Sequence, residues 1–523
     1  MNKVNNPIIP GFAPDPSVCA VGDDYYLVNS TFSYFPAVPI YHSKDLGHWE
    51  QIGNVLDREG QVDLKGVEHS EGIYAPTIRY HKGTFYMITT NMTKTGLGGN
   101  FYVTANDPKG PWSEPYFLKD AKGFDPSLFF DDDGKCYYIG TRSNSKGESY
   151  WGDNEIWAQE LDLEKKKLVG DSYRIWKGAL NNVIWTEGPH LYKIGNYYYL
   201  LIAEGGTGYG HSITVARSNT VFGEYTGNPY NPIATHRHLG PGYPITNVGH
   251  GDLVLAKDGE WYMVLLASRP MEGSDNLGRE TFLAKVSWYE EWPIINQGVG
   301  LITDSIALTI DKYDFKIDSA CIHFDGKMDK RLLFLRNPNK DCYSLTERKG
   351  FLRLYATQAA LQDLESPAYI GMRQQHFCYS FCAKMAFSLN EENDETGIVL
   401  MQSNVYFLRL VCKKQKEKTV LSLIRVSNGE ESILKEVTIT EKTLYLKMIG
   451  DGGNNHFYYS IDGERDILVE KNVDVSELCS EVAGGFVGNT MGIYASSNHA
   501  SSKGFADFAW MEYMPEINVG IPK

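Results

Sequence analysis

The sequence lacks the long apolar runs of membrane proteins and the paired cysteines of disulfide-rich secreted proteins. No stretch approaches the ~18 apolar residues that a membrane span requires, and residues 1–17 lack the apolar segment of a signal peptide. The 8 cysteines form no CxxC pair. Most lie in strand-like runs such as KCYYIG, which favours reduced core thiols over disulfides or metal ligands. These absences predict a soluble, cytoplasmic protein without a membrane partner.

Positive charge is also scarce. The 523 residues include 50 Lys and Arg against 65 Asp and Glu, which gives a net charge of -15. A basic run at 413–418, KKQKEK, is short and contains Glu417. Because this charge balance repels phosphate backbones, nucleic acid is excluded as a partner. The length exceeds that of a single hydrophobic core, so two domains are expected.

Long amphipathic helices are missing too, and a repeated hairpin unit takes their place in the first 300 residues. Each copy has a few apolar residues, a polar turn and an aromatic-rich strand, as in DPSVCAVGDDYYLVNST and EGPHLYKIGNYYYLLIA. Gly-Asp, Lys-Gly, Asp-Gly or Gly-Asn stands at the turn, which is typical of a β-hairpin. The copies begin at Asp15, Ala75, Asp125, Glu187 and Gly251.

The copies share a register that gives three acidic residues equivalent places. The first aromatic of the returning strand follows after 10 residues in four copies and after 12 in the Asp125 copy, where the turn is longer. Strand-built repeats of about 50–60 residues are typical of propeller blades. We therefore predict an all-β protein with a five-bladed β-propeller at 1–305. Asp15, Asp125 and Glu187 would meet at its axis, although each alone could be a turn or surface residue.

Three carboxyl groups in one cleft can perform acid–base chemistry. Their mutual repulsion splits their pKa values, so that one group stays protonated near neutral pH while another is ionised. Glycoside hydrolysis requires this division, with an acid for the leaving oxygen and a base for water. A metal site is the competing use of clustered carboxylates, but it would need further oxygen or imidazole ligands nearby. The residues favour a hydrolase.

The segments around these acids are GFAPDPSVCAVGDDYYLVNSTFSYFPAVPIYHSKDLGHW, IYAPTIRY, GFDPSLFFDDDGK and WTEGPHLYKIGNYYYLLIAEGGTGYGHS. They resemble glycoside hydrolase family 43, and the resemblance continues through LRNPN, GFLRLYA and RQQHF. It implies an inverting, exo-acting pentosidase on a five-bladed propeller. It further implies that Asp15 is the general base, Glu187 the general acid, and Asp125 the residue that raises the pKa of the acid and orients it. Inversion would place base and acid roughly 6.5–9.5 Å apart.

The same resemblance implies a set of substrate contacts. Arg279, in LGRET, matches an arginine that reaches the substrate and a carboxylate, with a surface charge as the alternative. The loop GGTGYG at 205–210 is predicted to border the pocket, since no GK follows as in a phosphate-binding loop. Tyr74 stands where family members usually have Trp, and core packing is the alternative for any one aromatic. The side chains predicted to bind sugar are Phe32, Phe35, Tyr74, Trp185, Glu204 and Thr207.

His250, in GHGD, matches a family histidine near the propeller axis. It is predicted to contact substrate and, through water, a cation such as Ca²⁺, and the alternative is a hydrogen-bonded core histidine. No cofactor is required for the acid–base chemistry itself. The run Asp131–Asp133 lacks the ligand spacing of a calcium loop, so we interpret it as a hairpin turn.

The second half of the chain loses the repeat. Residues 306–321 are predicted to be a linker, and 322–523 a jelly-roll-like β-sandwich, because short alternating runs such as LYLKMIG and HFYYSID are separated by turns such as DGGN. This domain could bind carbohydrate or shape the active site. The resemblance favours the second role, with Phe486 of AGGFVGNT closing one side of the pocket. A closed pocket would impose exo action on short oligosaccharides.

The substrate stays open at this point. A β-D-xylosidase acting on xylo-oligosaccharides and an α-L-arabinofuranosidase acting on arabinan or arabinoxylan side chains are both consistent with the sequence, because the two pentoses present similar hydroxyl groups. A non-catalytic sugar-binding propeller is the alternative of another class, and it would need a missing acid or base. A homo-oligomer is suggested by the resemblance alone.

Overall fold

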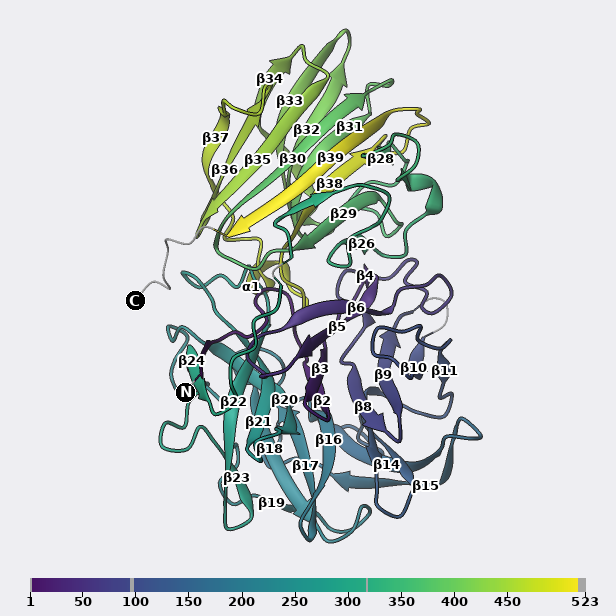
Figure 1. The fold of residues 1–523 in the computed structure, drawn as a ribbon, viewed down its shortest axis with the longest axis vertical. Helices are drawn as coiled ribbons and strands as arrows, with labels where there is room; N and C mark the ends of the chain where they lie inside the picture. The colour runs from purple at the N-terminus through teal and green to yellow at the C-terminus, as the bar shows by residue number, and fades with distance from the viewer. Residues whose placement is uncertain (1, 95–97, 317, 516–523) are drawn as a thin grey trace.

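A computed structural model describes residues 2–94, 98–316 and 318–515. Nearly every element is a strand, and the strands form two bodies stacked along the long axis (Figure 1). The helices among the described residues are the short α1 (Ser480–Ala483) and the 3₁₀ turn η1 (Lys340–Cys342). None of these described helices is long and apolar enough to cross a membrane. The all-β prediction is confirmed.

The N-terminal body is the predicted five-bladed propeller. Each blade is given from the axis outward. The first contains β2 (Ser17–Val21), β3 (Asp24–Val28), β5 (Ala37–Ser43) and β6 (Glu50–Leu56), and the second contains β7 (Gly72–Ile73) and β8 (Thr77–His81) with β9 (Thr84–Met92), β10 (Gly99–Ala105) and β11 (Tyr116–Phe117). The third contains β12 (Phe124–Phe130), β13 (Cys136–Ser143), β14 (Asn154–Asp162) and β15 (Lys167–Trp176); the fourth contains β16 (Glu187–Ile194), β17 (Tyr197–Glu204), β18 (Ser212–Ser218) and β19 (Thr226–Gly227); and the fifth contains β20 (Thr246–Leu255), β21 (Trp261–Ser268), β22 (Glu280–Tyr289) and β23 (Trp292–Ile295). Antiparallel pairing of β1 (Asn2–Asn5) with β24 (Ser305–Leu308) ties the start of the propeller to its end.

The two ends of the innermost strands differ. At one end each strand reverses through a tight turn, as at Gly195, whose φ of 60° favours glycine. At the other end the pairing of the innermost strand with its neighbour shifts, between Phe124 and Ser127 in β12 and between Glu187 and His190 in β16. Such bulges re-aim side chains and are frequent beside active sites. This second end of the axis holds the candidate site.

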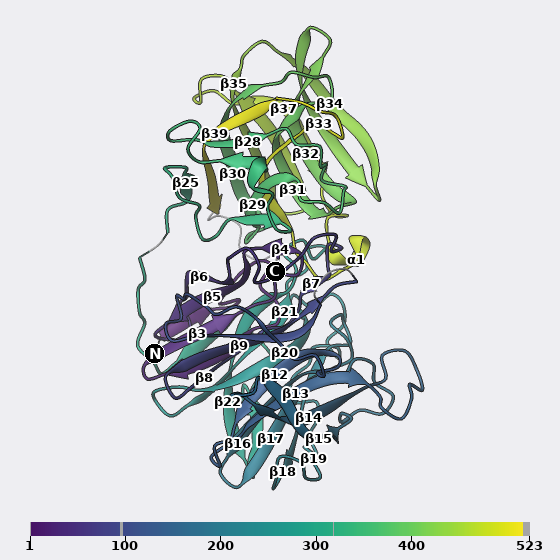
Figure 2. The same ribbon diagram turned by 90° about the vertical axis from the view of Figure 1, so that its right-hand side faces the viewer.

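The C-terminal body is a β-sandwich of two eight-stranded sheets (Figure 2). One sheet contains β25 (Cys321–His323), β27 (Tyr343–Ser344), β28 (Leu352–Tyr355), β30 (Cys378–Ser388), β35 (Thr443–Asp451), β36 (Asn454–Ser460), β37 (Ile467–Asp474) and β39 (Phe505–Pro515). The other contains β26 (Leu333–Leu335), β29 (Ala368–Arg373), β31 (Glu395–Ser403), β32 (Tyr406–Gln415), β33 (Lys418–Ser427), β34 (Glu430–Ile439), β38 (Thr490–Ser496) and β4 (Tyr34–Phe35).

The strand β4 belongs to the first blade by sequence and to the sandwich by pairing. Tyr34 and Phe35 pair with Leu335 and Phe334 of β26, so one sandwich sheet continues into the propeller. A single hydrophobic core runs from the first two blades into the sandwich and includes Phe35. The two domains are therefore joined by shared sheet and shared core, and not by the connecting segment alone.

Arg336 adds a polar connection at this junction. Its side chain is fully buried. Nε donates to the carbonyl oxygen of Val67 in the propeller at 2.7 Å, and Nη1 donates to that of Glu365 in the sandwich at 2.8 Å. Hydrogen bonds to a charged donor are stronger than neutral ones, so this residue fixes the two domains relative to each other.

Candidate active site

A pocket of about 510 Å³ opens at the bulged end of the propeller axis. Asp15 precedes β2, Asp125 lies in β12 and Glu187 opens β16, and all three side chains border the pocket. The other lining residues are Phe32, Tyr74, Ala75, Met92, Phe124, Ile184, Trp185, the loop 205–210, His250, Arg279 and Phe486. The structure thus brings together the three acids that the repeat register placed in equivalent positions.

Two of the acids occupy an unusual backbone conformation. Asp15 and Asp125 have φ values of 52° and 50°, in the left-handed region that non-glycine residues rarely adopt. Such conformations cost on the order of 1–3 kcal/mol each and cluster at functional sites, where the surrounding structure enforces them. The strain indicates that the direction of these carboxyl groups serves function.

Asp15 is held as an anion. Its Oδ2 accepts a hydrogen bond from Ser30 Oγ at 2.5 Å, and its Oδ1 accepts one from Arg279 Nη1 at 3.0 Å. Burial alone would raise the pKa of Asp15, but the positive charge of Arg279, with His250 and the Ser30 hydroxyl, outweighs burial and leaves the pKa below its usual value. An ionised carboxylate of this kind can accept a proton from water.

The pKa values of Glu187 and Asp125 are raised, in contrast to that of Asp15. Burial, followed by the negative charges of Asp125 and Asp15, raises the pKa of Glu187 well above its usual value. Burial and the charge of Asp15 also raise the pKa of Asp125 to about 8, although the N–H of Gly188 donates to its Oδ2 at 3.2 Å. Two neighbouring carboxyl groups share protons and titrate as a pair. The pair therefore retains a proton near neutral pH, which Glu187 can donate.

Aromatic rings form the wall of the pocket. The ring of Phe32 lies 5.5 Å from that of Tyr74 and 5.7 Å from that of Phe486, measured between centroids. Phe124 lies between Tyr74 and Trp185, with centroid distances of 6.5 Å and 6.2 Å. Apolar ring faces with a few convergent polar groups are the common lining of small-molecule sites.

Arg279 connects the base to the rest of the wall. Besides Asp15, its Nη1 donates to Thr207 Oγ1 at 2.7 Å, and its Nη2 donates to the carbonyl oxygen of Phe486 at 3.2 Å. The Arg279 side chain is 9% exposed, so its charge acts in a poorly screened environment. Arg279 and Thr207 both border the pocket, and their contacts with a sugar stay predictions.

Comparison with known proteins decides the family. Residues 4–293 match the family described as glycosyl hydrolases family 43, and residues 321–514 match the β-xylosidase C-terminal concanavalin A-like domain. The chain is 49% identical to a xylosidase/arabinosidase from Butyrivibrio fibrisolvens, over 97% of this chain and 98% of that one. This chain belongs to glycosyl hydrolase family 43.

Other members of family 43 share both domains. The solved structure of a xylan β-1,4-xylosidase from Bacillus halodurans matches with a TM-score of 0.91 and 34% identity, over 98% of this chain and 100% of that one. A non-reducing end α-L-arabinofuranosidase from Bacteroides ovatus is 36% identical, over 97% of this chain and 94% of that one. The protein is therefore a glycoside hydrolase, and the sandwich belongs to the same two-domain arrangement.

Two predicted sugar contacts of this family 43 enzyme do not border the pocket, contrary to the sequence-based prediction. Phe35 turns into the core between the domains because β4 pairs with β26. Glu204 ends β17 and is fully buried, and its Oε1 accepts a hydrogen bond from the backbone N–H of Ala179 at 2.6 Å. Burial raises the pKa of Glu204 to about 7. Its position supports the segment around Ala179 and leaves it no access to a ligand.

Several lining residues were not predicted. Phe124 immediately precedes Asp125, as Tyr74 precedes Ala75, so the repeat register carried the signal that would have found it. Met92 and Ile184 also border the pocket, whereas Tyr209 belongs to the loop 205–210 that was predicted to border it. Met92 and Ile184 lie outside the repeated positions, where spacing gives no orientation. The repeat therefore identifies pocket-lining residues at the starts of the blades, and residues elsewhere in the pocket lack such a signal.

His250 borders the pocket, with Nδ1 3.7 Å from Asp15 Oδ1. Burial holds the pKa of His250 below its usual value, which favours a neutral ring. Calcium prefers oxygen ligands, but the Asp15 oxygens already accept from Ser30 and Arg279. Within the described part of the chain, no group of three or more His, Cys, Asp or Glu is arranged to hold a metal. A Ca²⁺ ion bound directly to Asp15 would compete with these two donors, Ser30 and Arg279, and the water-mediated cation beside His250 stays a prediction.

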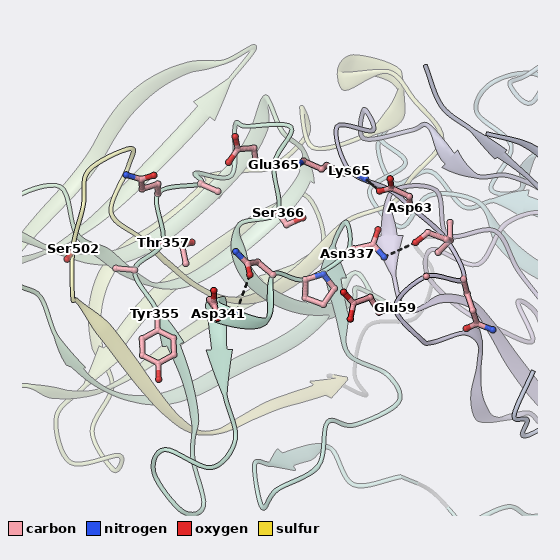
Figure 3. Close-up of a pocket in the computed structure, with 18 of the residues that line it drawn as sticks. Glu59, Asp63, Lys65, Asn337, Asp341, Tyr355, Thr357, Glu365, Ser366 and Ser502 are labelled. Carbon is pink, nitrogen blue, oxygen red and sulfur yellow. Dashed lines mark hydrogen bonds between the residues drawn. The ribbon is translucent and has the colours of Figure 1, made fainter. Parts of the chain in front are cut away.

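A larger cleft of about 1000 Å³ lies between the propeller and the sandwich. Figure 3 shows polar side chains on both walls, including Asp63 and Asn337, with the ring of Tyr355 nearby. Asn337 Nδ2 donates to the carbonyl oxygen of Val62 at 3.0 Å, and its Oδ1 accepts from the N–H of Leu64 at 2.7 Å. This cleft borders none of the three acids, so the catalytic chemistry belongs to the smaller pocket.

Proposed function

We propose that this family 43 enzyme removes single pentose units from the non-reducing ends of short xylo-oligosaccharides, with inversion at the anomeric carbon. The observation that carries the proposal is the split among the three carboxyl groups. Asp15 is held ionised by Arg279, whereas burial and neighbouring charge raise the pKa of Glu187. A base and an acid with opposite shifts are what a single-displacement glycosidase requires.

The reaction is a displacement by water. Asp15 accepts a proton from a water molecule while the water oxygen attacks the anomeric carbon. Glu187 donates its proton to the glycosidic oxygen, and the bond between that oxygen and the anomeric carbon breaks. The products are a free pentose of inverted configuration and the shortened oligosaccharide. Asp15 is then protonated and Glu187 ionised, and exchange with solvent restores both.

Two further residues set the protonation states. When Asp125 is ionised, its negative charge favours the protonated form of Glu187. The hydrogen bond from the N–H of Gly188 places Asp125 beside the start of β16. Arg279 favours the ionised form of Asp15 and occupies a position from which it can also reach a sugar hydroxyl. These roles divide the site into an acid half and a base half.

Cleavage at chain ends, or exo action, is explained by the wall that closes one side of the pocket. Phe486, from the sandwich, lies against Phe32 and Tyr74 and completes the wall. A long polysaccharide chain could not pass through such a pocket, whereas a chain end could enter it. The apolar wall would exclude water other than the nucleophile once a sugar is bound.

The proposal is tested with the full-length enzyme and its Glu187→Gln variant on xylobiose, xylotriose and aryl β-D-xylosides. We expect release of xylose from the chain end, with kcat in the variant lower by about 10²–10⁴-fold on xylobiose, the usual contribution of a general acid. The loss should be smaller on aryl glycosides with acidic leaving groups, which need less protonation. Equal activity of variant and wild type on xylobiose would contradict the assignment.

An α-L-arabinofuranosidase is the second candidate substrate assignment. The Bacteroides ovatus relative is named as such, and the Butyrivibrio fibrisolvens relative carries both activities in its name. The same acid and base would serve either pentose. A panel of aryl β-D-xylosides and α-L-arabinofuranosides distinguishes them by the ratio of kcat/KM values.

A further inference from the structure

The loop that brings Phe486 into the pocket is fastened to the propeller at the backbone of Phe486 itself. Its N–H donates to Ser70 Oγ at 2.9 Å, and its carbonyl oxygen accepts from Arg279 Nη2 at 3.2 Å. Both partners belong to the propeller, whereas Phe486 belongs to the sandwich. The ring is thus aimed by contacts made across the domain boundary.

Ser70 itself lies in a firmly held segment. Ser33 Oγ donates to the carbonyl oxygen of His69 at 2.8 Å. Three residues after Ser70, Ile73 and Phe32 exchange two backbone hydrogen bonds, at 2.9 and 3.0 Å. The Ser70 hydroxyl is therefore fixed relative to Phe32, whose ring lies 5.7 Å from that of Phe486.

The loop approaches the propeller more closely than a side chain would allow. A Cβ atom added to Gly485, which has φ of 79°, would lie 2.2 Å from Ser70 Oγ. A Cβ atom added to Gly488 would lie 2.1 Å from the carbonyl oxygen of Leu277. Gly485 thus permits the contact of the loop with Ser70, and Gly488 permits its close approach to Leu277. Glycine backbone is also conformationally freer than that of other residues.

A second cavity beside the pocket leaves room for the Phe486 ring to move. A space of about 370 Å³ adjoins the pocket and shares with it residues 207–209, Arg279 and Phe486. Arg279 and the Phe486 backbone are therefore part of a partition between the two spaces. If the Ser70 contact were lost, the loop could shift toward this cavity and widen the pocket.

We propose that Ser70 is a positioning residue, which sets the width of the sugar pocket through the backbone of Phe486. The inference rests on the proposed function for its kinetic consequence, since the wall that Ser70 positions would contact the terminal pentose. Ser70 is not among the residues that line the pocket with Asp15 and Glu187, so it would act on ground-state binding through Phe486 and not on proton transfer. Its loss should therefore change KM more than kcat.

The kinetic test compares Ser70→Ala, Ser70→Thr and the control Ser366→Ala, which lies in the interdomain cleft. For Ser70→Ala on xylobiose we expect KM to rise about tenfold, the size of a lost hydrogen bond and a loosened ring contact, with kcat within about twofold of wild type. Ser70→Thr, which keeps the hydroxyl, should restore KM. An unchanged KM, or an equal fall of kcat and kcat/KM without rescue, would overturn the proposal.

A spectroscopic readout keeps the test independent of the substrate assignment. The enzyme is labelled with 4-fluorophenylalanine, and the ¹⁹F resonance of Phe486 is assigned by its loss in Phe486→Leu. Ser70→Ala should shift or broaden this resonance, and Ser70→Thr and Ser366→Ala should not. An unchanged Phe486 resonance in Ser70→Ala would contradict the positioning role of Ser70, even if the enzyme hydrolysed no pentoside. Absence of wild-type pentosidase activity with a moved resonance would instead count against the proposed function alone.

Discussion

Arg279 Nη1 lies 3.0 Å from Asp15 Oδ1, and this contact sets the charge of the candidate base. The two side chains are 9% and 8% exposed, so water screens the pair only partly. Arg279 immediately precedes β22 of the last blade, whereas Asp15 precedes β2 of the first. The closure of the propeller ring is thus what places the positive charge beside the base.

Removal of this charge should shift the acidic limb of the pH profile. Arg279 lowers the pKa of Asp15, so in Arg279→Met that pKa rises and the ionised base is lost at a higher pH. We expect the acidic limb of kcat/KM to move to higher pH, with a loss of about 10–100-fold at its optimum, the cost of about 1.5–3 kcal/mol for one charged hydrogen bond. Arg279→Lys, which keeps the charge, should shift the limb less. If the acidic limb stayed at the same pH in Arg279→Met, the ionisation of Asp15 would not be the cause of that limb.

Removal of the Asp125 charge should shift the opposite limb. Asp125 raises the pKa of Glu187, so Asp125→Asn lowers that pKa and the acid loses its proton at a lower pH. The alkaline limb of kcat/KM should therefore move to lower pH, measured on an aryl xyloside between pH 4 and 10. Asp132→Asn is the control, since this carboxylate is 83% exposed. A shift to higher pH would contradict the coupling between the two groups.

The junction at Arg336 predicts an effect on stability. Arg336→Met would remove the donor from a buried hydrogen bond to the Val67 carbonyl oxygen and from a part-buried one to that of Glu365. A buried group left unpaired costs about 1–3 kcal/mol, so most of the loss is expected at Val67. We expect the midpoint of thermal unfolding to fall, as measured by differential scanning calorimetry, while kcat at 25 °C changes little. The exposed Arg465→Met serves as the control. Equal unfolding midpoints in Arg336→Met and Arg465→Met would mean that the hydrogen bonds of Arg336 contribute nothing to thermal stability.

Chelation should leave the enzyme active. The oxygens of Asp15 already accept hydrogen bonds, and Arg279 provides the positive charge beside it, so no step of the proposed reaction requires a cation. Dialysis against EDTA is therefore expected to preserve kcat/KM within about twofold, with the metal content followed by mass spectrometry. Loss of activity that Ca²⁺ restores would show that a cation near His250 is required.

The sequence predicted the propeller and the meeting of the acids because both depend on a repeat. Equal spacing to the returning strand fixed the register, and register determines which side chains face the axis. Phe124 could have been found in the same way. By contrast, Phe35 could not be placed, since β4 leaves the blade and pairs with β26, more than 290 residues later in the chain. Long-range pairing of a two-residue strand leaves no local pattern.

Glu204 shows a second limit of sequence reasoning. It directly precedes the loop 205–210 that borders the pocket, yet its side chain turns away and accepts from Ala179. At the end of a strand, alternation no longer predicts direction, because the chain leaves the sheet plane within one or two residues. Phe486 was found through resemblance, but its fastening to Ser70 depends on how two domains dock, which spacing within either domain does not encode.

The configuration of the first-released sugar tests the central claim most directly. The full-length enzyme is mixed with xylobiose or an aryl β-D-xyloside, and the anomeric protons are followed by NMR from the first minutes, before mutarotation. Single displacement, with Asp15 as base and Glu187 as acid, predicts that α-D-xylose appears first and that the β anomer grows in afterwards. Initial appearance of β-D-xylose would mean retention of configuration and would contradict the mechanism.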